Sequence, residues 1–306
     1  MPAQGEALGN TMVEVERSPE GATYTAPRRV CRPFGAPVLL QPRFSRAAPW
    51  AVPCCPFGAV GRSYVVVLGA SPMDQRTREP QYQCTLDLKA SKGLTRLGLM
   101  TNVTWDTDPK RLAFVLARYK FVSKMLSGLP RVLEVGCADA WASRIVVQEV
   151  GRLTAVDFDP VFIEDARSRM DARWGFDLAV HDILQGPVAG PFEGAYSLDV
   201  LEHIPKERED EFVKNLAGSL TPAGVMIVGS PSFASQAYAS EPSRLGHINC
   251  KDAPGLKTLL ARFFENVFLF SMNDEVVHTG FYPLAHYYLA LCCGRSPGSV
   301  KSGGTT

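Results

Sequence analysis

The pattern of residues 131–160, RVLEVGCADAWASRIVVQEVGRLTAVDFDP, is the clearest indication of how this chain folds. An apolar run at 132–135 ends at Gly136, and a second apolar run at 153–156 ends at Asp157. Between them the chain is rich first in small residues and then in isoleucine and valine, which favours a helix with one buried face. The stretch therefore predicts a buried strand, a tight turn, a helix and a second buried strand.

The turn and the acid that follows it also indicate a ligand. A turn of small residues between a strand and a helix lets backbone N–H groups approach a bound molecule closely. An acid about twenty residues later suits the two hydroxyls of a ribose. The stretch therefore predicts the first half of a nucleoside-binding site.

Composition and charge limit the possible classes of protein. The chain has 306 residues, of which 46% are hydrophobic and 21% are charged, as in soluble globular proteins. Its net charge of +1 gives no basic field for nucleic acid. The longest apolar runs, near 63–70 and 281–293, are too short to span a bilayer, and the N-terminus lacks the regions of a secretory signal. We expect a cytoplasmic protein with no nucleic-acid partner and no stable membrane insertion.

Cysteines and histidines show no metal-ligand spacing. The eight cysteines include no C-x-x-C pair, and no two of the five histidines are spaced like a metal pair on a helix. We therefore expect reduced thiols, no disulfide framework and no metal site.

Residues 1–72 differ in composition from the rest of the chain. They hold ten of the 23 prolines and carry seven arginines, no lysine and four glutamates, a charge of 7 − 4 = +3. Proline removes a backbone donor and blocks helices, so a packed domain is not expected there. We expect a disordered extension, or an upstream translation that the working protein lacks; the alternative is a small N-terminal subdomain.

From residue 108 onward, helical and strand patterns alternate. Apolar residues recur at helical spacing over 109–128, after which strands are predicted at 132–135, 153–156, 178–180, 195–198, 225–228, 267–272 and 282–291. Helices are expected between them near 140–150, 160–174, 205–220 and 253–264. The alternation predicts an α/β fold, a doubly wound, mostly parallel seven-stranded sheet with an antiparallel C-terminal hairpin strand. Around this domain (108–294) we expect a linker and lid segment at 73–107 and a flexible tail at 295–306.

Five segments in order carry a family resemblance: LEVGCADA (133–140), TAVDFDP (154–160), AVHDI (179–183), SLDVLEHIP (197–205) and LTPAGVMIVGSP (220–231). Together they resemble the class I S-adenosylmethionine-dependent methyltransferases, over roughly residues 95–294. The motif style is most similar to that of the small-molecule, ubiquinone-type O-methyltransferases. In an open α/β sheet the ligand lies outside the carboxyl ends of the strands, where these segments fall.

The resemblance implies which residues contact S-adenosylmethionine. Glu134 and Gly136 would frame its methionine part, Asp157 would accept its ribose hydroxyls, and Asp182 would accept a hydrogen bond from its adenine amino group. The other members of the implied set are Cys137, Ala138, Phe158 and Ile183, with Ser197 and Leu198 at the sulfonium end. Taken alone, Asp157 also suits a helix cap and Asp182 a turn.

The loop departs from the family's E-x-G-x-G-x-G pattern, because Ala138 and Ala140 stand where glycines are usual. Alanine disfavours a positive φ, so the loop must tolerate two added methyl groups. One alternative is therefore a methyltransferase-like binding module that has lost catalysis. Another is a dinucleotide-dependent oxidoreductase with a G-x-G-x-x-G fingerprint; it fits worse, because only the first glycine is present.

Two histidines are candidates for the catalytic base. Methyl transfer to oxygen requires removal of a proton, and histidine is the commonest base. His203 lies in SLDVLEHIP and His247 in RLGHINCKD, a segment that the resemblance places over the active site. Each of them also suits a structural role in its loop. Glu202 orients a histidine or begins a helix, and His278 and His286 are expected to be structural.

The sequence thus predicts a methyltransferase that uses S-adenosylmethionine to methylate a small-molecule, saccharide-like or lipid-linked acceptor. The insert at 230–252 is short, which argues against a macromolecular substrate with a docking domain. The sequence leaves open whether oxygen, nitrogen or carbon receives the methyl group, and it gives no oligomeric state.

Overall fold

The computed structural model describes residues 76–280 and 282–296. The predictions for residues 1–72, and for 297–306 of the tail, lie outside the described residues.

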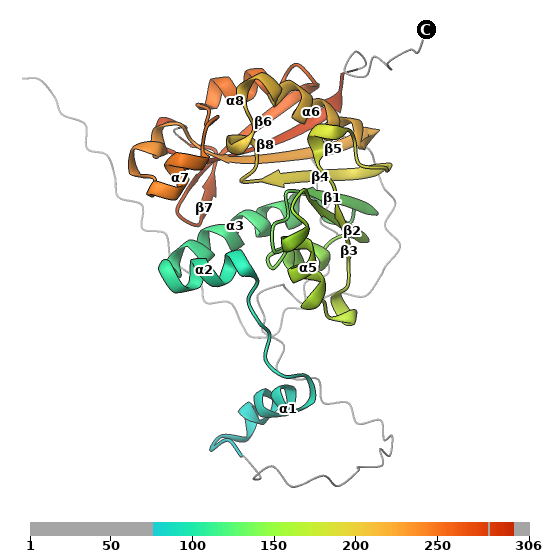
Figure 1. The fold of residues 1–306 in the computed structure, drawn as a ribbon, viewed down its shortest axis with the longest axis vertical. Helices are drawn as coiled ribbons and strands as arrows, with labels where there is room; N and C mark the ends of the chain where they lie inside the picture. Colours follow the sequence, from blue (N-terminus) through green and yellow to red (C-terminus); the bar gives the residue numbers. More distant parts are fainter. Residues whose placement is uncertain (1–75, 281, 297–306) are drawn as a thin grey trace, which may run out of the picture. The chain divides into compact units, whose positions relative to one another are not determined.

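One eight-stranded sheet organises the domain, in the order β3-β2-β1-β4-β5-β8-β6-β7 (Figure 1). The first five strands along the chain run parallel, and β8 inserts antiparallel between β5 and β6. The strands are β1 (Arg131–Val135), β2 (Arg152–Asp157), β3 (Asp177–Val180), β4 (Phe192–Leu198), β5 (Leu220–Pro231), β6 (Phe264–Asn273), β7 (Val276–His278) and β8 (Tyr287–Arg295). Strand order reverses between β1 and β4, where such sheets bind ligands.

The predicted fold class is confirmed, with two differences at the C-terminal end. The extra strand is β7, a short partner of β6 formed after a turn at Asp274, where φ is 50°. The predicted strand at 282–291 begins only at Tyr287, because Tyr282–Leu284 forms a 3-10 turn. Pro283 has no N–H to donate to a strand ladder, which disfavours an earlier start.

The α-helices of the described residues are α1 (Gln83–Lys92), α2 (Leu99–Thr107), α3 (Lys110–Met125), α4 (Ser143–Val147), α5 (Pro160–Ser168), α6 (Glu209–Gly218), α7 (Glu241–Gly246) and α8 (Ala253–Leu260). Local capping explains where some of them begin. Asp159 accepts from the Val161 N–H at the start of α5, and Pro160 supplies the first helical position. Helix α4 is shorter than the predicted 140–150, because the chain is still turning at Ala140, where φ is 50°.

Helices cover both faces of the sheet, as its buried positions require. Met226 and Val228 of β5 pack into a cluster with α6 and α8, whereas Ile227 between them packs into a cluster with α3 and α4. Successive side chains of a strand point to opposite faces, so this central strand is buried on both sides. The core therefore fixes the parallel strands so that their carboxyl ends lie together at one end of the sheet.

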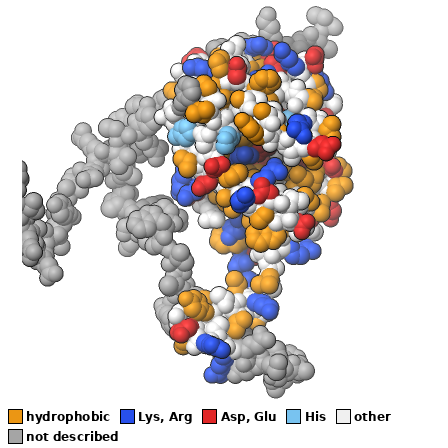
Figure 2. Space-filling model, turned by 90° about the vertical axis from the view of Figure 1, so that its left-hand side faces the viewer, with side chains coloured by type: hydrophobic (Ala, Val, Ile, Leu, Met, Phe, Trp, Pro, Cys, Tyr) orange, Lys and Arg blue, Asp and Glu red, His pale blue; other side chains and the backbone are white. Residues whose placement is uncertain are grey.

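The surface of the domain carries both signs of charge. On the face that Figure 2 shows, basic and acidic side chains are interspersed rather than gathered into one stripe. Among the described residues, no helix combines the length and the apolar character that crossing a membrane requires.

Candidate active site

The loop after β1 is held close to its neighbours. Gly136 has a φ of 78°, and a Cβ added to it would lie 2.2 Å from Cγ2 of Val200. The N–H groups of Gly136 and Cys137 both donate to the carbonyl of Val156 in β2, at 2.8 and 3.1 Å. Glycine is therefore required here both by backbone conformation and by space.

Both alanines of the loop adopt the left-handed conformation that glycine normally takes. Ala138 has a φ of 45° and Ala140 a φ of 50°. This conformation costs an L-residue roughly 1–2 kcal/mol. Hydrogen bonds offset the cost: the Ala138 N–H donates to Oδ2 of Asp157 at 2.8 Å, and the Ala140 N–H donates to the Cys137 carbonyl at 2.8 Å. The loop thus follows a glycine-like path despite its two methyl groups.

Asp157 stands at the end of β2, beside this loop. Its side chain is buried, with Oδ2 bound by the Ala138 N–H and Oδ1 by the Asp159 N–H at 3.0 Å. The cap of α5 is Asp159, so the helix-cap explanation of Asp157 does not apply. Each carboxylate oxygen can accept more than one hydrogen bond, which leaves acceptor capacity at this strand end.

Phe158, the next residue, projects into solvent with 72% of its surface exposed. A large aromatic ring in that position gives up burial that a core phenylalanine would gain. Its flat face is suited to stacking against a planar base. Asp157 and Phe158 together present a carboxylate and an aromatic surface at one strand end.

Asp182 follows β3, the neighbour of β2. Its Oδ1 accepts from the Leu184 N–H at 2.9 Å and so starts the 3-10 turn Ile183–Gln185. Asp182 therefore acts as a turn residue, which was one of the two roles that the sequence allowed. Ile183 is buried in the core, so only its backbone is left to meet a ligand.

Glu134 lies beneath the loop rather than in the open. Its side chain is buried and accepts a hydrogen bond from the Tyr119 hydroxyl of α3 at 2.7 Å. Burial raises the pKa of Glu134, while the hydroxyls of Ser143, Tyr119 and Tyr196 partly offset that rise. Glu134 therefore joins α3 to β1 under the loop.

At the end of β4, the side chains of three successive residues are bonded to or packed against other parts of the protein. Ser197 is buried and donates to the Val135 carbonyl at 2.8 Å, and Leu198 packs in the core. Asp199 follows with a φ of 56°, and both of its carboxylate oxygens accept from Nη1 of Arg118, at 2.8 and 2.7 Å. The Arg118 guanidinium also lies 3.7 Å from the ring centre of Tyr287. This pair was not predicted, because its members lie far apart in the sequence.

The two candidate catalytic histidines lie together. The rings of His203 and His247 are 5.1 Å apart between centres and are steeply inclined, at 71°. Burial lowers the pKa of His247, and the neighbouring His203 lowers it further. Glu202 is fully buried beside them. His278 lies elsewhere, in β7, where Nε2 contacts the Asn273 side-chain oxygen at 2.8 Å.

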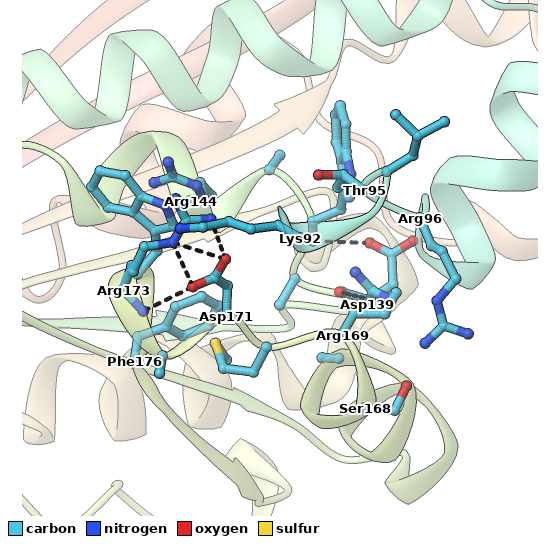
Figure 3. Close-up of a pocket in the computed structure, with 18 of the residues that line it drawn as sticks. Lys92, Thr95, Arg96, Asp139, Arg144, Ser168, Arg169, Asp171, Arg173 and Phe176 are labelled. Carbon is cyan, nitrogen blue, oxygen red and sulfur yellow. Dashed lines mark hydrogen bonds and ion pairs between the residues drawn. The ribbon is translucent and has the colours of Figure 1, made fainter. Parts of the chain in front are cut away.

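A separate cavity of about 770 Å³ adjoins the outer side of the loop (Figure 3). It is reached by Asp139 and Ala140, but Asp157, Asp182 and Ser197 are not among its lining residues. Its basic residues are partly paired within the protein: Arg173 bonds to Asp171, and Arg169 to Asp165. The motif residues therefore mark the strand ends, rather than this cavity, as the candidate active site.

Comparison with known families agrees with the arrangement of these strand ends. A family model described as a methyltransferase domain matches residues 132–224, from β1 into β5. That range contains the loop, both candidate cofactor aspartates and His203. The chain therefore carries a methyltransferase domain of the S-adenosylmethionine-dependent class.

Individual relatives are distant. The ubiquinone biosynthesis O-methyltransferase of Xanthomonas axonopodis pv. citri is 26% identical over 153 residues, which are 48% of this chain and 63% of that protein. The matched region thus spans less than two thirds of that relative's length. The enzyme of the same name from Xanthomonas campestris pv. campestris (strain B100) is 25% identical over 182 residues, 55% of this chain and 70% of that protein.

Among solved structures, an S-adenosylmethionine-dependent methyltransferase from Clostridium acetobutylicum aligns with a TM-score of 0.52. The alignment covers 63% of this chain and 97% of the other, at 9% identity. At that identity the likeness shows the fold alone, and it confirms the doubly wound methyltransferase architecture.

Proposed function

We propose that this protein transfers the methyl group of S-adenosylmethionine to an oxygen atom of a small-molecule acceptor. The observation that carries the proposal is the carboxylate of Asp157, buried at the end of β2 and oriented by two backbone N–H groups. A carboxylate held in this way suits the two hydroxyls of a ribose, and the exposed ring of Phe158 beside it suits an adenine.

The loop from Gly136 to Ala140 supports the same assignment. Its left-handed residues turn the backbone sharply at the strand end, and the residues at 136, 138 and 140 are small, so the backbone there can approach a ligand closely. When bound, the cofactor supplies an electrophilic methyl carbon on a positively charged sulfur. The protein's task is then to orient the acceptor beside it and to take a proton from the acceptor.

His247 is suited to the second task. Its lowered pKa keeps the ring neutral near neutral pH, and its Nδ1 is engaged by the Gln236 side-chain oxygen at 2.9 Å. The other ring nitrogen is then free to accept a proton. His203 lies beside it and is held by the Gly246 carbonyl. Oxygen is the acceptor atom that most needs such a base, and the two relatives are named as O-methyltransferases.

The segment between β5 and α8 favours an acceptor with an apolar part. Four of its large apolar side chains are mostly exposed: Phe233, Tyr238, Leu245 and Ile248. Apolar side chains gathered near a site mark a surface for an apolar ligand or partner. A lipid-linked acceptor, or a saccharide with an apolar substituent, fits this surface better than a purely polar small molecule.

A binding module without catalysis is the second candidate, and the left-handed alanines are the observation that favours it. Turnover measurements separate the two. The purified protein is incubated with S-adenosylmethionine and a panel of phenolic, saccharide and lipid-linked hydroxyl compounds, and S-adenosylhomocysteine is quantified. Acceptor-dependent release supports the enzyme; cofactor binding without release for any acceptor supports the binding module.

Substitution of the base sharpens that experiment. With an accepted substrate, His247→Ala is expected to lower kcat by about 10²–10⁴-fold while S-adenosylhomocysteine binding, measured by calorimetry, stays within about twofold. His286→Ala is the matched control, because that histidine is exposed and lies before β8. Equal turnover in His247→Ala and the wild type would remove His247 as the base.

A further inference from the structure

Three potential ligand atoms converge just after β4. A carboxylate oxygen of Glu202 and one ring nitrogen each of His203 and His247 all lie within 4.8 Å of one another. Glu202 and His203 belong to the 3-10 turn Leu201–His203, whereas His247 follows α7. The two segments are fixed together, because the N–H groups of Ile248 and Asn249 both donate to the Glu202 carbonyl, at 2.8 and 3.0 Å.

The histidine rings are oriented by acceptors on their outer sides. His203 Nδ1 lies 2.9 Å from the Gly246 carbonyl, which only accepts, so Nδ1 carries the proton. His247 Nδ1 lies 2.9 Å from the Gln236 side-chain oxygen. The Gln236 amide is itself oriented, because its nitrogen donates to the Ser232 carbonyl at 3.3 Å. An N–H donated to an oxygen, with the other nitrogen unprotonated, is the usual state of a metal-ligating histidine.

The buried carboxyl group of Glu202 points to a cation at this place. Its side chain is fully buried, and neither carboxylate oxygen accepts a well-formed hydrogen bond from the described residues. A buried, unpartnered carboxylate is costly, and a bound cation removes that cost. Arg118 is already paired with Asp199.

We propose that Glu202, His203 and His247 bind one divalent transition-metal ion. Two imidazoles and one carboxylate favour first-row ions such as Zn²⁺ over Mg²⁺ or Ca²⁺, which prefer oxygen ligands. Three protein ligands leave coordination positions open, and the open side faces outward, since His203 is exposed and His247 half-buried.

The role assigned to this ion rests on the proposed methyl transfer. The cluster follows Val200, whose side chain touches the space at Gly136, so it borders the strand ends where the cofactor is proposed to bind. An acceptor hydroxyl bound to the ion loses its proton more readily, because a divalent cation lowers the pKa of a coordinated oxygen. That proton passes to water; the oxygen–carbon bond forms as the carbon–sulfur bond breaks. With the ion bound, His247 is one of its ligands, and the ion takes over from the free His247 ring the task of removing the acceptor proton.

Metal binding is tested without cofactor or acceptor, so its outcome is independent of the proposed methyl transfer. The full-length protein is stripped with EDTA, dialysed and titrated with ZnCl₂ alone by calorimetry; metal content is then counted by mass spectrometry. We expect one equivalent of Zn²⁺, not displaced by excess Mg²⁺ or Ca²⁺. Absence of a stoichiometric Zn²⁺ site, or displacement of Zn²⁺ by Mg²⁺, overturns the proposal.

Variants identify the site. Glu202→Gln and His247→Ala are each expected to weaken Zn²⁺ binding by at least about tenfold, and Gln236→Leu, which removes the partner of His247, by about tenfold. His286→Ala is the control and retains wild-type affinity. Wild-type affinity in a folded Glu202→Gln variant overturns the proposal. If that variant fails to fold, as judged by circular dichroism, Gln236→Leu decides, and unchanged affinity there overturns the proposal equally.

Discussion

The carboxyl ends of the parallel strands form a candidate site with two halves, and these halves are built in different ways. The half at β1 and β2 is made by one continuous stretch, and its backbone conformation and the buried carboxylate of Asp157 define it. The half after β4 is made by side chains from separate segments, with Glu202 and His203 meeting His247. The first half is therefore sensitive to added volume and to φ, and the second to charge and protonation. Substitutions that change volume or φ in the first half, and charge in the second, test whether the two halves differ in this way.

The largest effect is expected at Gly136. Gly136→Ala places a Cβ 2.2 Å from Cγ2 of Val200 at a φ of 78°, so the loop or Val200 must move. We expect loss of measurable S-adenosylhomocysteine binding and a loss of roughly 1–3 kcal/mol in the free energy of unfolding. Calorimetry and chemical denaturation measure the two effects.

Gly128 provides the matched control for that change. Its φ is 80°, but an added Cβ would meet nothing within 4 Å. Gly128→Ala therefore carries the same left-handed strain, about 1–2 kcal/mol, without the clash. Retained cofactor binding in Gly136→Ala, or equal loss of binding in both variants, would contradict the argument from close packing.

The second half is expected to respond to pH. Because the pKa of Glu202 is raised to about 8 in the folded protein, folding favours its protonated form. The unfolded state releases this proton near pH 4.5, so the stability contributed by Glu202 falls as pH rises from about 4.5 to 8. In EDTA, Glu202→Gln is expected to match the wild type near pH 5 and to exceed its melting temperature at pH 8. The same difference in melting temperature between the two proteins at pH 5 and at pH 8 would refute this.

The smallest effect is expected at Ala138. Ala138→Gly removes the cost of a left-handed alanine but adds chain entropy to the unfolded state, so the free energy of unfolding should rise by at most about 1 kcal/mol. Ala142 is the control, because its φ is −78°, and Ala142→Gly should lower stability by roughly 0.5–1 kcal/mol. Chemical denaturation measures both. The same sign in the two variants would show that the left-handed conformation is not what distinguishes them.

The same contrast explains what the sequence could predict. The parallel strands and the placement of Asp157 were predictable, because apolar runs, small residues and the acid follow one another in the chain. The burial of Glu134 and the commitment of Ser197 to the Val135 carbonyl were not, because partners from α3 and β1 decide them. His203 and His247 come together because the segment that contains α7 packs against the turn after β4, and no spacing in the sequence predicts that contact.

Asp157 is proposed to anchor an adenosyl cofactor at the end of β2. Calorimetric titration of the wild type and of Asp157→Ala with S-adenosylhomocysteine tests it, with Asp210→Asn as the control, since Asp210 is an exposed acid on α6 paired with Arg262. Loss of a charge-assisted hydrogen bond costs about 1.5–3 kcal/mol, so we expect affinity to fall by at least about tenfold in Asp157→Ala alone. Wild-type affinity in a folded Asp157→Ala protein, or no binding by the wild type, would contradict the account.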